Sequence, residues 1–391
     1  MRIALVTETY PPEVNGVART VQLFAEGLSR RGHHIQLVRP RQNPEDRAAD
    51  RDGFSELLRP GLAVPRYPQL RFGLPSGEVL ARAWRDRRPD VVHVATEGPL
   101  GWSALSAATR LGIPTATDFH TNFHAYSRHY GFAWLRRPVE AWLRRFHNRA
   151  GCTIVPTDEL AGGLERLGFE RLRVVGRGVD AGTFSPAKRS GELRARWGAG
   201  EDTPVALCVS RFAPEKNFPL VIEAYKAMRT ARPDTKLVLV GEGPMLEELR
   251  AAMGGMGCLI AGRLVNGELS THYASADIFL FPSVTETFGN VTLEAMASGL
   301  AVVAHDYAAA RQVIVHRRSG LLSPPGDDAA FIRQAVGLAQ DLEGARALGR
   351  EARAIAERQS WEAVVGDFET VLGNTIAAAA ASQGEAAHAA P

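Results

Sequence analysis

The sequence predicts an α/β protein made of two Rossmann-like domains in tandem, each with a doubly wound parallel sheet. Short apolar runs with the character of buried strands alternate with helical patterns along the chain. This alternation stops once, at a Gly-, Pro- and charge-rich seam over 178–200, and then begins again. At 391 residues the chain is also too long for one ordinary core. We therefore expect two domains facing a cleft, with ligands at the carboxyl ends of the strands.

The first domain is expected over residues 1–185. Its first strand is the apolar run 2–6, and apolar residues at helical spacing then extend from Gly16 to Arg31, where Gly32 ends the helix. The same order of strand, loop and helix continues along the domain, with strands predicted at 35–38, 90–94, 114–119, 152–155 and 172–175 and a helix at 102–110.

The second domain is expected over residues 190–355. Its pattern predicts strands at 205–210, 236–240, 258–261, 277–281 and 301–304 and helices at 220–230 and 245–252. A C-terminal helix over 356–374 is a candidate to cross back to the first domain, and the Ala-rich end, 377–391, is predicted to be a disordered tail. Three cysteines lie in strand-like runs and read as core thiols of a reducing cytosol: Cys152, Cys208 and Cys258.

Glu286 and Glu294 stand on either side of a predicted helix start, just after the strand 277–281. The backbone N–H groups near Gly289 form an anion site there, because the first N–H groups of a helix lack partners and the helix dipole is positive at that end. Carboxylates beside an anion site suit a ligand with both hydroxyls and phosphates, such as a nucleotide sugar. Alternatively, Glu294 only complements the helix start and Glu286 is a solvated loop acid.

Arg211 and Lys216 follow the strand 205–210 in the segment CVSRFAPEKNF, so both fall at a strand's carboxyl end. Paired cations neutralise a diphosphate in place of a metal ion. The glycines Gly241 and Gly243 follow another strand and could belong to a third ligand loop. An ordinary turn explains this glycine pair equally well.

The first half of the chain offers two more candidates at strand ends. Gly16 begins the first predicted helix, but the G-x-G-x-x-G pattern of dinucleotide-binding proteins is missing there. His120 follows the strand 114–119, and a structural histidine is the alternative reading. His124 and His129 lie nearby, but no Cys, Asp or Glu completes the spacing of a metal site. We therefore expect no metal.

Together these motifs resemble glycosyltransferase family 4, retaining enzymes of the GT-B architecture, over roughly residues 1–370. ETFGNVTLE resembles the family's E-x7-E motif, SRFAPEKN its R-x4-K diphosphate pair, NGVART its glycine loop and DFHT its active-site histidine. ETYPPEVNGVARTV and FHTNFHAYSRHYGF are further similar to the branch with GDP-mannose-dependent α-mannosyltransferases and sulfoquinovosyl- or glucosyl-diacylglycerol synthases. The residues beside the histidine fit no single donor class.

The resemblance implies a metal-independent hexosyltransferase that needs no cofactor and uses GDP-mannose or a UDP-hexose as donor. It implies four catalytic residues: His120, Glu286, Arg211 and Lys216. The donor-binding residues that it implies are Gly16, Arg211, Lys216, Arg263, Glu286, Phe288, Gly289, Asn290, Val291 and Glu294. Glu286 would contact the hexose, Glu294 the ribose hydroxyls, and His120 the sugar near its 6-position. A catalytically silent nucleotide-sugar-binding protein is one alternative, and a Rossmann oxidoreductase is disfavoured by the missing glycine pattern.

A lipid such as diacylglycerol, met at an anionic membrane surface, is the expected acceptor, with a soluble or polysaccharide acceptor as the alternative. Residues 1–150 carry a net charge of +8 and the remainder −5. The segment 129–150 repeats an aromatic–apolar–Arg–Arg block that suits shallow docking on anionic lipid, unless its Trp face packs into the core. Candidate acceptor contacts are Tyr10, Arg66, Tyr126 and Arg128. No nucleic acid partner is expected, and the location is expected to be cytoplasmic, peripheral on the inner face of the plasma membrane.

Overall fold

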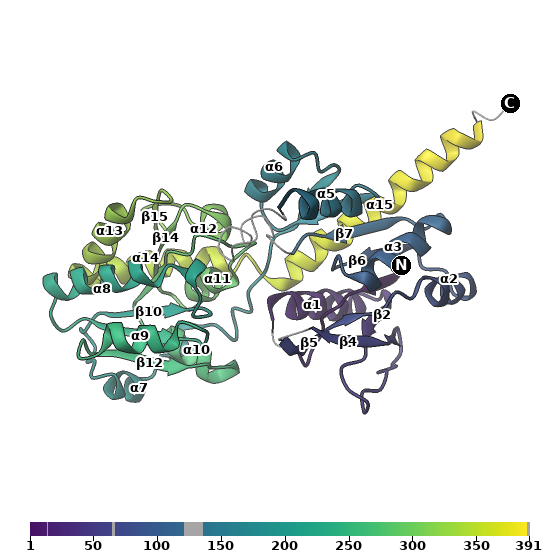
Figure 1. Cartoon of the computed structure of the whole chain (residues 1–391). Helices are drawn as coiled ribbons and strands as arrows, with labels where there is room; N and C mark the ends of the chain where they lie inside the picture. Colours follow the sequence, from purple (N-terminus) through teal and green to yellow (C-terminus); the bar gives the residue numbers. More distant parts are fainter. Residues whose placement is uncertain (14, 65–66, 121–135, 389–391) are drawn as a thin grey trace. The chain divides into compact units, whose positions relative to one another are not determined.

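The computed structural model describes residues 1–13, 15–64, 67–120 and 136–388, and its contacts divide the chain into two compact units. The first unit contains the described residues up to Arg177 and those from Trp361 onward, and the second unit is Gly178–Ser360. Each unit has helices packed around a parallel sheet, as Figure 1 shows, so the two predicted Rossmann-like domains are confirmed. The chain changes unit between Arg177 and Gly178, earlier than the boundary expected at 185–190.

The sheet of the first unit has seven strands in the order β3-β2-β1-β6-β7-β8-β9. All neighbouring strands are parallel. The order reverses between β1 and β6, which pair directly. The strands are β1 (Arg2–Val6), β2 (His34–Pro40), β3 (Phe54–Arg59), β6 (Val91–Val94), β7 (Thr115–Asp118), β8 (Cys152–Val155) and β9 (Leu172–Val174).

Three strands of the first unit were not predicted: β3 and the antiparallel pair β4 (Gly61–Val64) and β5 (Tyr67–Gly73). In β3 only Phe54 is buried, so this strand lacks the apolar run that marks the others. An ion-pair network holds it in place instead: buried Arg39 of β2 lies 2.6 Å from Asp46 and 2.8 Å from Glu56 of β3.

The helices of the first unit are α1 (Gly16–Arg30), α2 (Gly77–Asp86), α3 (Pro99–Arg110), α5 (Arg136–His147), α6 (Asp158–Arg166) and α15 (Trp361–His388). α1 begins where the side chain of Asn15 accepts a hydrogen bond from the Ala18 N–H at 2.8 Å, which satisfies one of the unpaired donors of a helix start. Its apolar face, including Val21, Phe24 and Leu28, is buried in the core of the unit.

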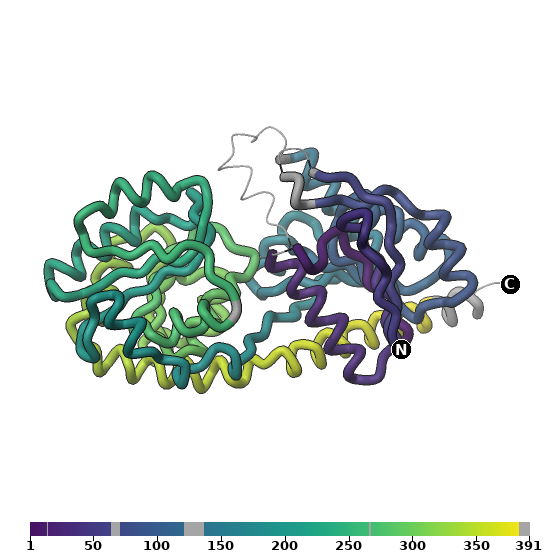
Figure 2. Tube along the Cα trace, turned by 90° about the horizontal axis from the view of Figure 1, so that it is seen from below, coloured from purple at the N-terminus to yellow at the C-terminus, as the bar shows by residue number. Residues whose placement is uncertain are grey.

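α15 belongs to the first unit, although it follows the second in sequence. Phe368 of α15 stacks on Phe24 of α1 with ring centroids 4.1 Å apart, and Glu369 lies 2.5 Å from Arg31. The helix continues to His388, so the disordered tail predicted from residue 377 is wrong for 377–388; an alanine run favours helix because alanine has the highest helix propensity. Figures 1 and 2 show α15 in yellow extending beyond the sheet of its unit. No helix in the described part of the chain could span a membrane.

The sheet of the second unit has six strands in the order β12-β11-β10-β13-β14-β15, all parallel. The order reverses between β10 and β13. The strands are β10 (Val205–Val209), β11 (Lys236–Val240), β12 (Cys258–Gly262), β13 (Ile278–Phe281), β14 (Ala301–His305) and β15 (Leu321–Ser323). The predicted runs 205–210, 236–240, 258–261, 277–281 and 301–304 correspond to the first five of these strands in chain order.

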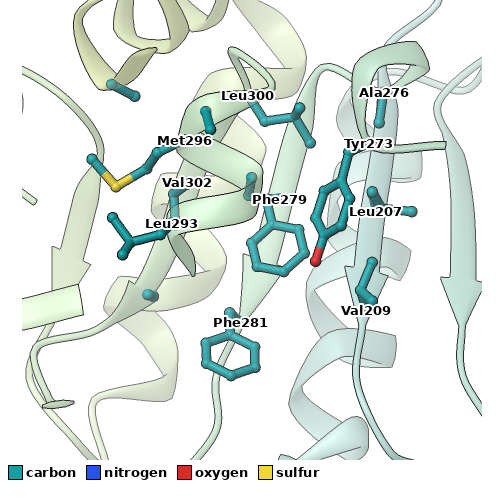
Figure 3. Packing of buried hydrophobic residues seen from close by; sticks show 14 of the residues in the cluster. Leu207, Val209, Tyr273, Ala276, Phe279, Phe281, Leu293, Met296, Leu300 and Val302 are labelled. Atoms are coloured by element: carbon teal, nitrogen blue, oxygen red, sulfur yellow. The ribbon is translucent and has the colours of Figure 1, made fainter. Parts of the chain in front are cut away.

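The helices of the second unit are α7 (Gly191–Arg196), α8 (Phe218–Ala231), α9 (Leu246–Met253), α10 (Asn266–Ser275), α11 (Asn290–Ala297), α12 (Ala308–Val313), α13 (Asp328–Gln340) and α14 (Leu342–Ala356). They cover a sheet whose side chains are buried on both faces. Figure 3 shows Phe279 of β13 between Leu293 of α11 and Tyr273 of α10. This core fixes the position of α10 and α11 beside the end of β13.

The predicted seam, residues 178–200, belongs to the second unit and packs against its sheet through buried arginine contacts. Arg194, 3% exposed, donates to Asp277 at 3.0 Å and to the Thr203 carbonyl at 2.7 Å. Arg189 donates to the other oxygen of Asp277 at 2.8 Å. The buried carboxylate of Asp277 thus has two cationic partners, as a buried charge requires, and this explains why the unit begins before the seam ends.

Candidate active site

The carboxyl ends of β10 and β13 lie next to each other, at the point where the strand order of the second sheet reverses. Open parallel sheets bind ligands at such a point, because the connections after the two strands run in opposite directions and leave a crevice. The loop after β10 carries Arg211 and Lys216, and the loop after β13 carries Glu286. The predicted donor-binding residues of this unit therefore meet at one edge of the sheet.

Lys216 and Glu286 form an ion pair between these two loops. Nζ of Lys216 contacts Oε1 of Glu286, and the two side chains are only 13% and 14% exposed. The lysine also lies 5.9 Å from the ring centroid of Phe281, and the Tyr307 hydroxyl donates to the Glu286 carbonyl at 3.0 Å. Glu286 is therefore not a solvated loop acid but a paired carboxylate with a fixed backbone.

Glu215 supports Arg211, a role that could not be predicted from the sequence. Its carboxylate is fully buried and pairs with the guanidinium of Arg211, which is half exposed. Its carbonyl accepts hydrogen bonds from the Val284 N–H at 3.1 Å and the Ser283 hydroxyl at 3.3 Å. Glu215 thus orients the Arg211 side chain and connects the loop after β10 to the loop after β13 through hydrogen bonds.

The glycines Gly241 and Gly243 form the support of the Arg211 loop. A Cβ at Gly241 would lie 1.9 Å from the Ser210 carbonyl oxygen, and one at Gly243 would lie 2.4 Å from the Phe212 carbonyl oxygen. The Phe212 N–H donates to the Glu242 carbonyl at 2.8 Å in the same contact. The pair is thus required for close approach between two loops, which an ordinary turn would not need.

The start of α11 lies directly after the Glu286 loop. Gly289 caps it with a φ of 99°, a left-handed conformation that favours glycine. Asn290 and Val291 form the first turn, whose N–H groups have no acceptor within the helix. Phe288 is buried, and its carbonyl accepts from the Ala309 N–H at 2.9 Å, so this residue anchors the loop through the core.

Glu294 lies on α11 and accepts a hydrogen bond from the hydroxyl of buried Tyr273 at 2.9 Å. Burial raises the pKa of the Glu294 carboxyl to about 7, and the Tyr273 hydrogen bond offsets part of that shift. The role of Tyr273 could not be predicted from the sequence. An ionised carboxylate accepts hydroxyl hydrogen bonds more strongly than a protonated one, so a carboxyl that changes charge near neutral pH makes such hydrogen bonds depend on pH.

Arg263 follows β12 and lies 3.2 Å from Glu242, with both side chains largely exposed. It therefore belongs to the loops at the same edge of the sheet as Gly241 and Gly243. Its proposed contact with the donor remains a prediction.

Gly16 and His120 belong to the first unit. A Cβ at Gly16 would meet nothing within 4 Å, so the protein's own packing does not require a glycine there. Nε2 of His120, at the end of β7, lies 3.1 Å from Asp118, and its Nδ1 lies 3.4 Å from the Arg177 guanidinium. Asp118 and Arg177 are both buried, and sequence reasoning missed both.

Tyr10, a predicted acceptor contact, is only 9% exposed and packs in the core of the first unit. Burial raises the pKa of its hydroxyl to about 12. The other acceptor candidates, Arg66, Tyr126 and Arg128, lie outside the described residues, as do His124 and His129. Acceptor recognition therefore stays a prediction.

Glu8 occupies the start of α3 at the switch point of the first sheet. Its buried carboxylate accepts from the Leu100 N–H at 2.9 Å and the Gly101 N–H at 3.4 Å, and also from the Gly73 N–H. Burial raises the pKa of this carboxyl to about 7, although these hydrogen bonds act in the opposite direction. The anion position of α3 is therefore filled by the protein itself.

In the described part of the chain, no three His, Cys, Asp or Glu side chains gather as a metal site would require. Asp50 and Asp52 line a pocket with Arg51 at the start of β1–β3, at the edge opposite to the strands' carboxyl ends. Asp50 accepts from the Glu56 N–H at 3.0 Å. Independence from metal stays a prediction.

Comparison with solved structures identifies the class of fold. The chain resembles sucrose-phosphate synthase from Thermosynechococcus elongatus with a TM-score of 0.75 at 20% sequence identity, over 96% of this chain and 99% of that one. Two Rossmann-like units of this kind, with the motifs described above, define the GT-B class of glycosyltransferases.

Family models and relatives give the family. The model described as Glycosyltransferase Family 4 matches residues 14–182, and Glycosyl transferases group 1 matches 203–341. A GDP-mannose-dependent alpha-mannosyltransferase of Mycobacterium tuberculosis is 34% identical over 97% of this chain and 99% of its own length. The chain belongs to glycosyltransferase family 4.

Two further relatives confirm the branch that the sequence resembled. Sulfoquinovosyl transferase SQD2 of Arabidopsis thaliana is 31% identical over 93% of this chain and 71% of its own length. Alpha-monoglucosyldiacylglycerol synthase of Streptococcus pneumoniae is 27% identical over 82% of this chain and 75% of its own. This chain is therefore a glycosyltransferase that transfers a sugar from a nucleotide sugar.

Proposed function

We propose that this protein transfers a hexose, with retention of configuration, from a nucleotide-diphosphate sugar to a hydroxyl of a membrane lipid. The observation that carries the proposal is the cluster of Arg211, Lys216 and Glu286 at the switch point of the second sheet. Two cations and a carboxylate beside the start of a helix suit a diphosphate that carries a sugar. GDP-mannose is the donor we favour, because a relative at 34% identity over nearly its whole length is named for it.

In the first step of donor binding, the ion pair between Lys216 and Glu286 opens. The diphosphate brings negative charge to the cations, so Lys216 exchanges its carboxylate partner for a phosphate oxygen. Glu286 is then released to accept hydrogen bonds from the hexose hydroxyls. Arg211 and Lys216 stabilise the charge that grows on the diphosphate as the sugar leaves, which is the work a metal ion would otherwise perform.

No protein nucleophile takes part in the proposed reaction. The acceptor hydroxyl forms a bond to the anomeric carbon on the face from which the diphosphate departs, while the bond from that carbon to the phosphate oxygen breaks. The acceptor proton passes to the departing phosphate oxygen. His120 contacts the sugar near its 6-position, and Glu294 accepts hydrogen bonds from the ribose hydroxyls.

A membrane acceptor is supported by the surface of α5 and by one relative's name. Trp142 is 42% exposed and packs on Trp102 with ring centroids 5.8 Å apart, while Leu143 and Phe146 of the same helix are buried. Arg145 is exposed beside Trp142. One part of the predicted apolar face is thus core, and Trp142 remains at the surface, where an aromatic ring beside arginine suits the lipid headgroup region. The pneumococcal relative is named as an alpha-monoglucosyldiacylglycerol synthase.

The test is sugar transfer by purified protein from GDP-mannose, UDP-glucose and other nucleotide sugars, with diacylglycerol vesicles and soluble sugars as alternative acceptors. We expect donor-dependent glycolipid formation with an α-anomeric product from an α-linked donor. Efficient transfer only to soluble sugars would contradict the lipid acceptor, and a β-anomeric product would contradict retention. Nucleotide-sugar binding without transfer or release of sugar would favour the catalytically silent alternative.

A further inference from the structure

Arg177 is buried at the end of the first unit and contacts the candidate catalytic histidine. It is only 3% exposed. One guanidinium nitrogen donates to the Val175 and Gly176 carbonyls at 3.0 and 3.1 Å. The other lies 3.5 Å from Asp118 Oδ1 and 3.4 Å from His120 Nδ1. The guanidinium also lies 5.8 Å from the ring centroid of Phe24. All of these contacts of Arg177 are made within the first unit.

The charges around His120 show why an arginine is needed there. Asp118 is fully buried, and although its burial acts to raise the pKa of the carboxyl, the neighbouring His120 and Arg177 hold that pKa well below its usual range. His93 of β6 is the next ionisable group; burial lowers its pKa to about 4, so it is neutral at pH 7. Arg177 is therefore the one permanent cation among the described groups that balance Asp118.

The hydrogen-bond geometry also selects one form of the imidazole. A guanidinium only donates, so the nitrogen that faces Arg177, Nδ1 of His120, must accept. The proton of a neutral imidazole then sits on Nε2, which lies 3.1 Å from Asp118 Oδ2. With Arg177 present, Asp118 has its counter-charge whether or not His120 is protonated.

We propose that Arg177 is a positioning residue that fixes the ring of His120 in its Nε2–H form, because the guanidinium donates to Nδ1 and also supplies a positive charge beside Asp118. The proposal rests on the proposed function for its catalytic consequence, since His120 is assigned there to the sugar. The described groups that face His120 are Asp118 on its own strand end, Arg177 after β9 and His93 on β6. Without Arg177, Nδ1 of His120 loses the guanidinium that donates to it, so the ring is no longer restricted to the Nε2–H form.

The test uses the full-length chain with ¹⁵N-labelled histidine and compares Arg177→Met, Arg177→Lys and the wild type. His120→Gln assigns the His120 ring signals in long-range ¹H–¹⁵N spectra recorded from pH 5 to 9. We expect the wild-type ring to show the Nε2–H form at pH 7 and Arg177→Met to lose this single form at the same pH, because Nδ1 no longer faces the guanidinium, with Arg177→Lys between them. Arg194→Met is the matched control, because Arg194 is equally buried on an aspartate but lies in the other unit.

An unchanged His120 spectrum in folded Arg177→Met would overturn the proposal, and so would the same change in Arg194→Met. If Arg177→Met fails to fold, the ring form of His120 in Arg177→Lys and in Asp118→Asn decides. We expect Asp118→Asn to keep the Nε2–H form, because Arg177 still donates to Nδ1, and Arg177→Lys to lose it in part; an unchanged ring form in Arg177→Lys would overturn the proposal. The spectra do not depend on turnover. A wild type that transfers no sugar would therefore count against the proposed function and not against this role of Arg177.

Discussion

Lys216 Nζ contacts the carboxylate of Glu286 across 70 positions of sequence, and both side chains are largely buried. Without donor, this ion pair joins the loop after β10 to the loop after β13 and leaves neither charge uncompensated. In the proposed reaction the diphosphate of the donor competes for the lysine and the sugar hydroxyls compete for the glutamate. Donor binding would then replace the whole ion pair, so substitution of either residue is expected to change the kinetics.

Lys216→Ala is expected to lower kcat/KM by about 10²-fold or more, the scale of losing one charge contact in the transition state. Lys226→Ala is the matched control, because Lys226 pairs with Glu223 at 2.8 Å on the exposed face of α8. Steady-state kinetics with the preferred donor measures both. Turnover of Lys216→Ala close to the wild-type value would remove this residue from the site.

Arg211→Ala is expected to lose a similar factor in kcat/KM and to lose more stability than Lys216→Ala. The reason is that the carboxylate of Glu215, which would lose its guanidinium partner, is fully buried, whereas the Glu286 side chain is 14% exposed. Urea unfolding separates the two effects, and the double variant Arg211→Ala with Glu215→Gln is expected to regain part of the stability but not the activity. Recovery of activity in the double variant would show that Arg211 acts only through folding.

His120→Ala is expected to slow sugar transfer while leaving the affinity for the nucleotide diphosphate unchanged. The reason is that His120 is assigned to the sugar, and it lies on the first unit while the diphosphate residues lie on the second. Calorimetric titration with nucleotide diphosphate and single-turnover kinetics measure the two quantities. Equal weakening of nucleotide binding would indicate a structural histidine.

Glu294 is expected to make nucleotide affinity dependent on pH. The pKa of its carboxyl is about 7, and an ionised carboxylate accepts hydrogen bonds from the ribose hydroxyls more strongly than a protonated carboxyl, so affinity should rise as pH increases through about 7 and then level off. Glu294→Gln should bind more weakly at pH 8 and show a flatter profile. A Glu294→Gln profile as steep as the wild-type profile would assign the pH dependence to another group.

The stability of the ligand-free protein should change with pH in the opposite direction. The Glu294 carboxyl has a pKa of about 7 when folded, raised from 4.5, so the folded chain binds more protons than the unfolded chain between these values. The free energy of unfolding therefore falls as pH rises from about 4.5 to about 7, by roughly 1–3 kcal/mol for this group. Glu8 contributes with the same sign, so Glu294→Gln should remove only its own share. Urea unfolding at pH 5 and pH 8 measures the difference between wild type and variant.

The sequence predicted the fold wherever strands are continuous apolar runs. Strands that are buried on both faces of a parallel sheet are apolar at successive positions, so they are easy to recognise in the sequence. It missed β3, since only Phe54 of that strand is buried and charged residues hold the rest. The loops that carry Arg211, Lys216 and Glu286 could be predicted as ligand loops, because each directly follows a predicted strand. Glu215, Asp118 and Arg177 could not be predicted, because their roles depend on which distant side chain they contact. The sequence also could not show whether Trp142 faces core or solvent, because its helix carries both buried and exposed aromatics.

Removal of metal ions is expected to leave turnover unchanged. Arg211 and Lys216 supply the positive charge that a diphosphate leaving group needs, so a divalent cation has no required place in the proposed reaction. Turnover is measured after dialysis against excess EDTA, with and without added Mg²⁺. Activity that EDTA abolishes and Mg²⁺ restores would contradict metal independence.

The exposed part of α5 is expected to dock on anionic lipid. The double variant Trp142→Ser with Arg145→Glu should bind vesicles of anionic lipid at least about fivefold more weakly, since one interfacial arginine contributes ~1 kcal/mol and the Trp ring adds apolar contact. Val79→Ser is the matched control, because Val79 of α2 is 40% exposed, close to the 42% of Trp142, in the same unit. Co-sedimentation at low and high salt, with neutral and anionic vesicles, measures the effect. Wild-type binding that ignores both salt and lipid charge would contradict docking through this surface, and so would an equal loss in the Val79 control.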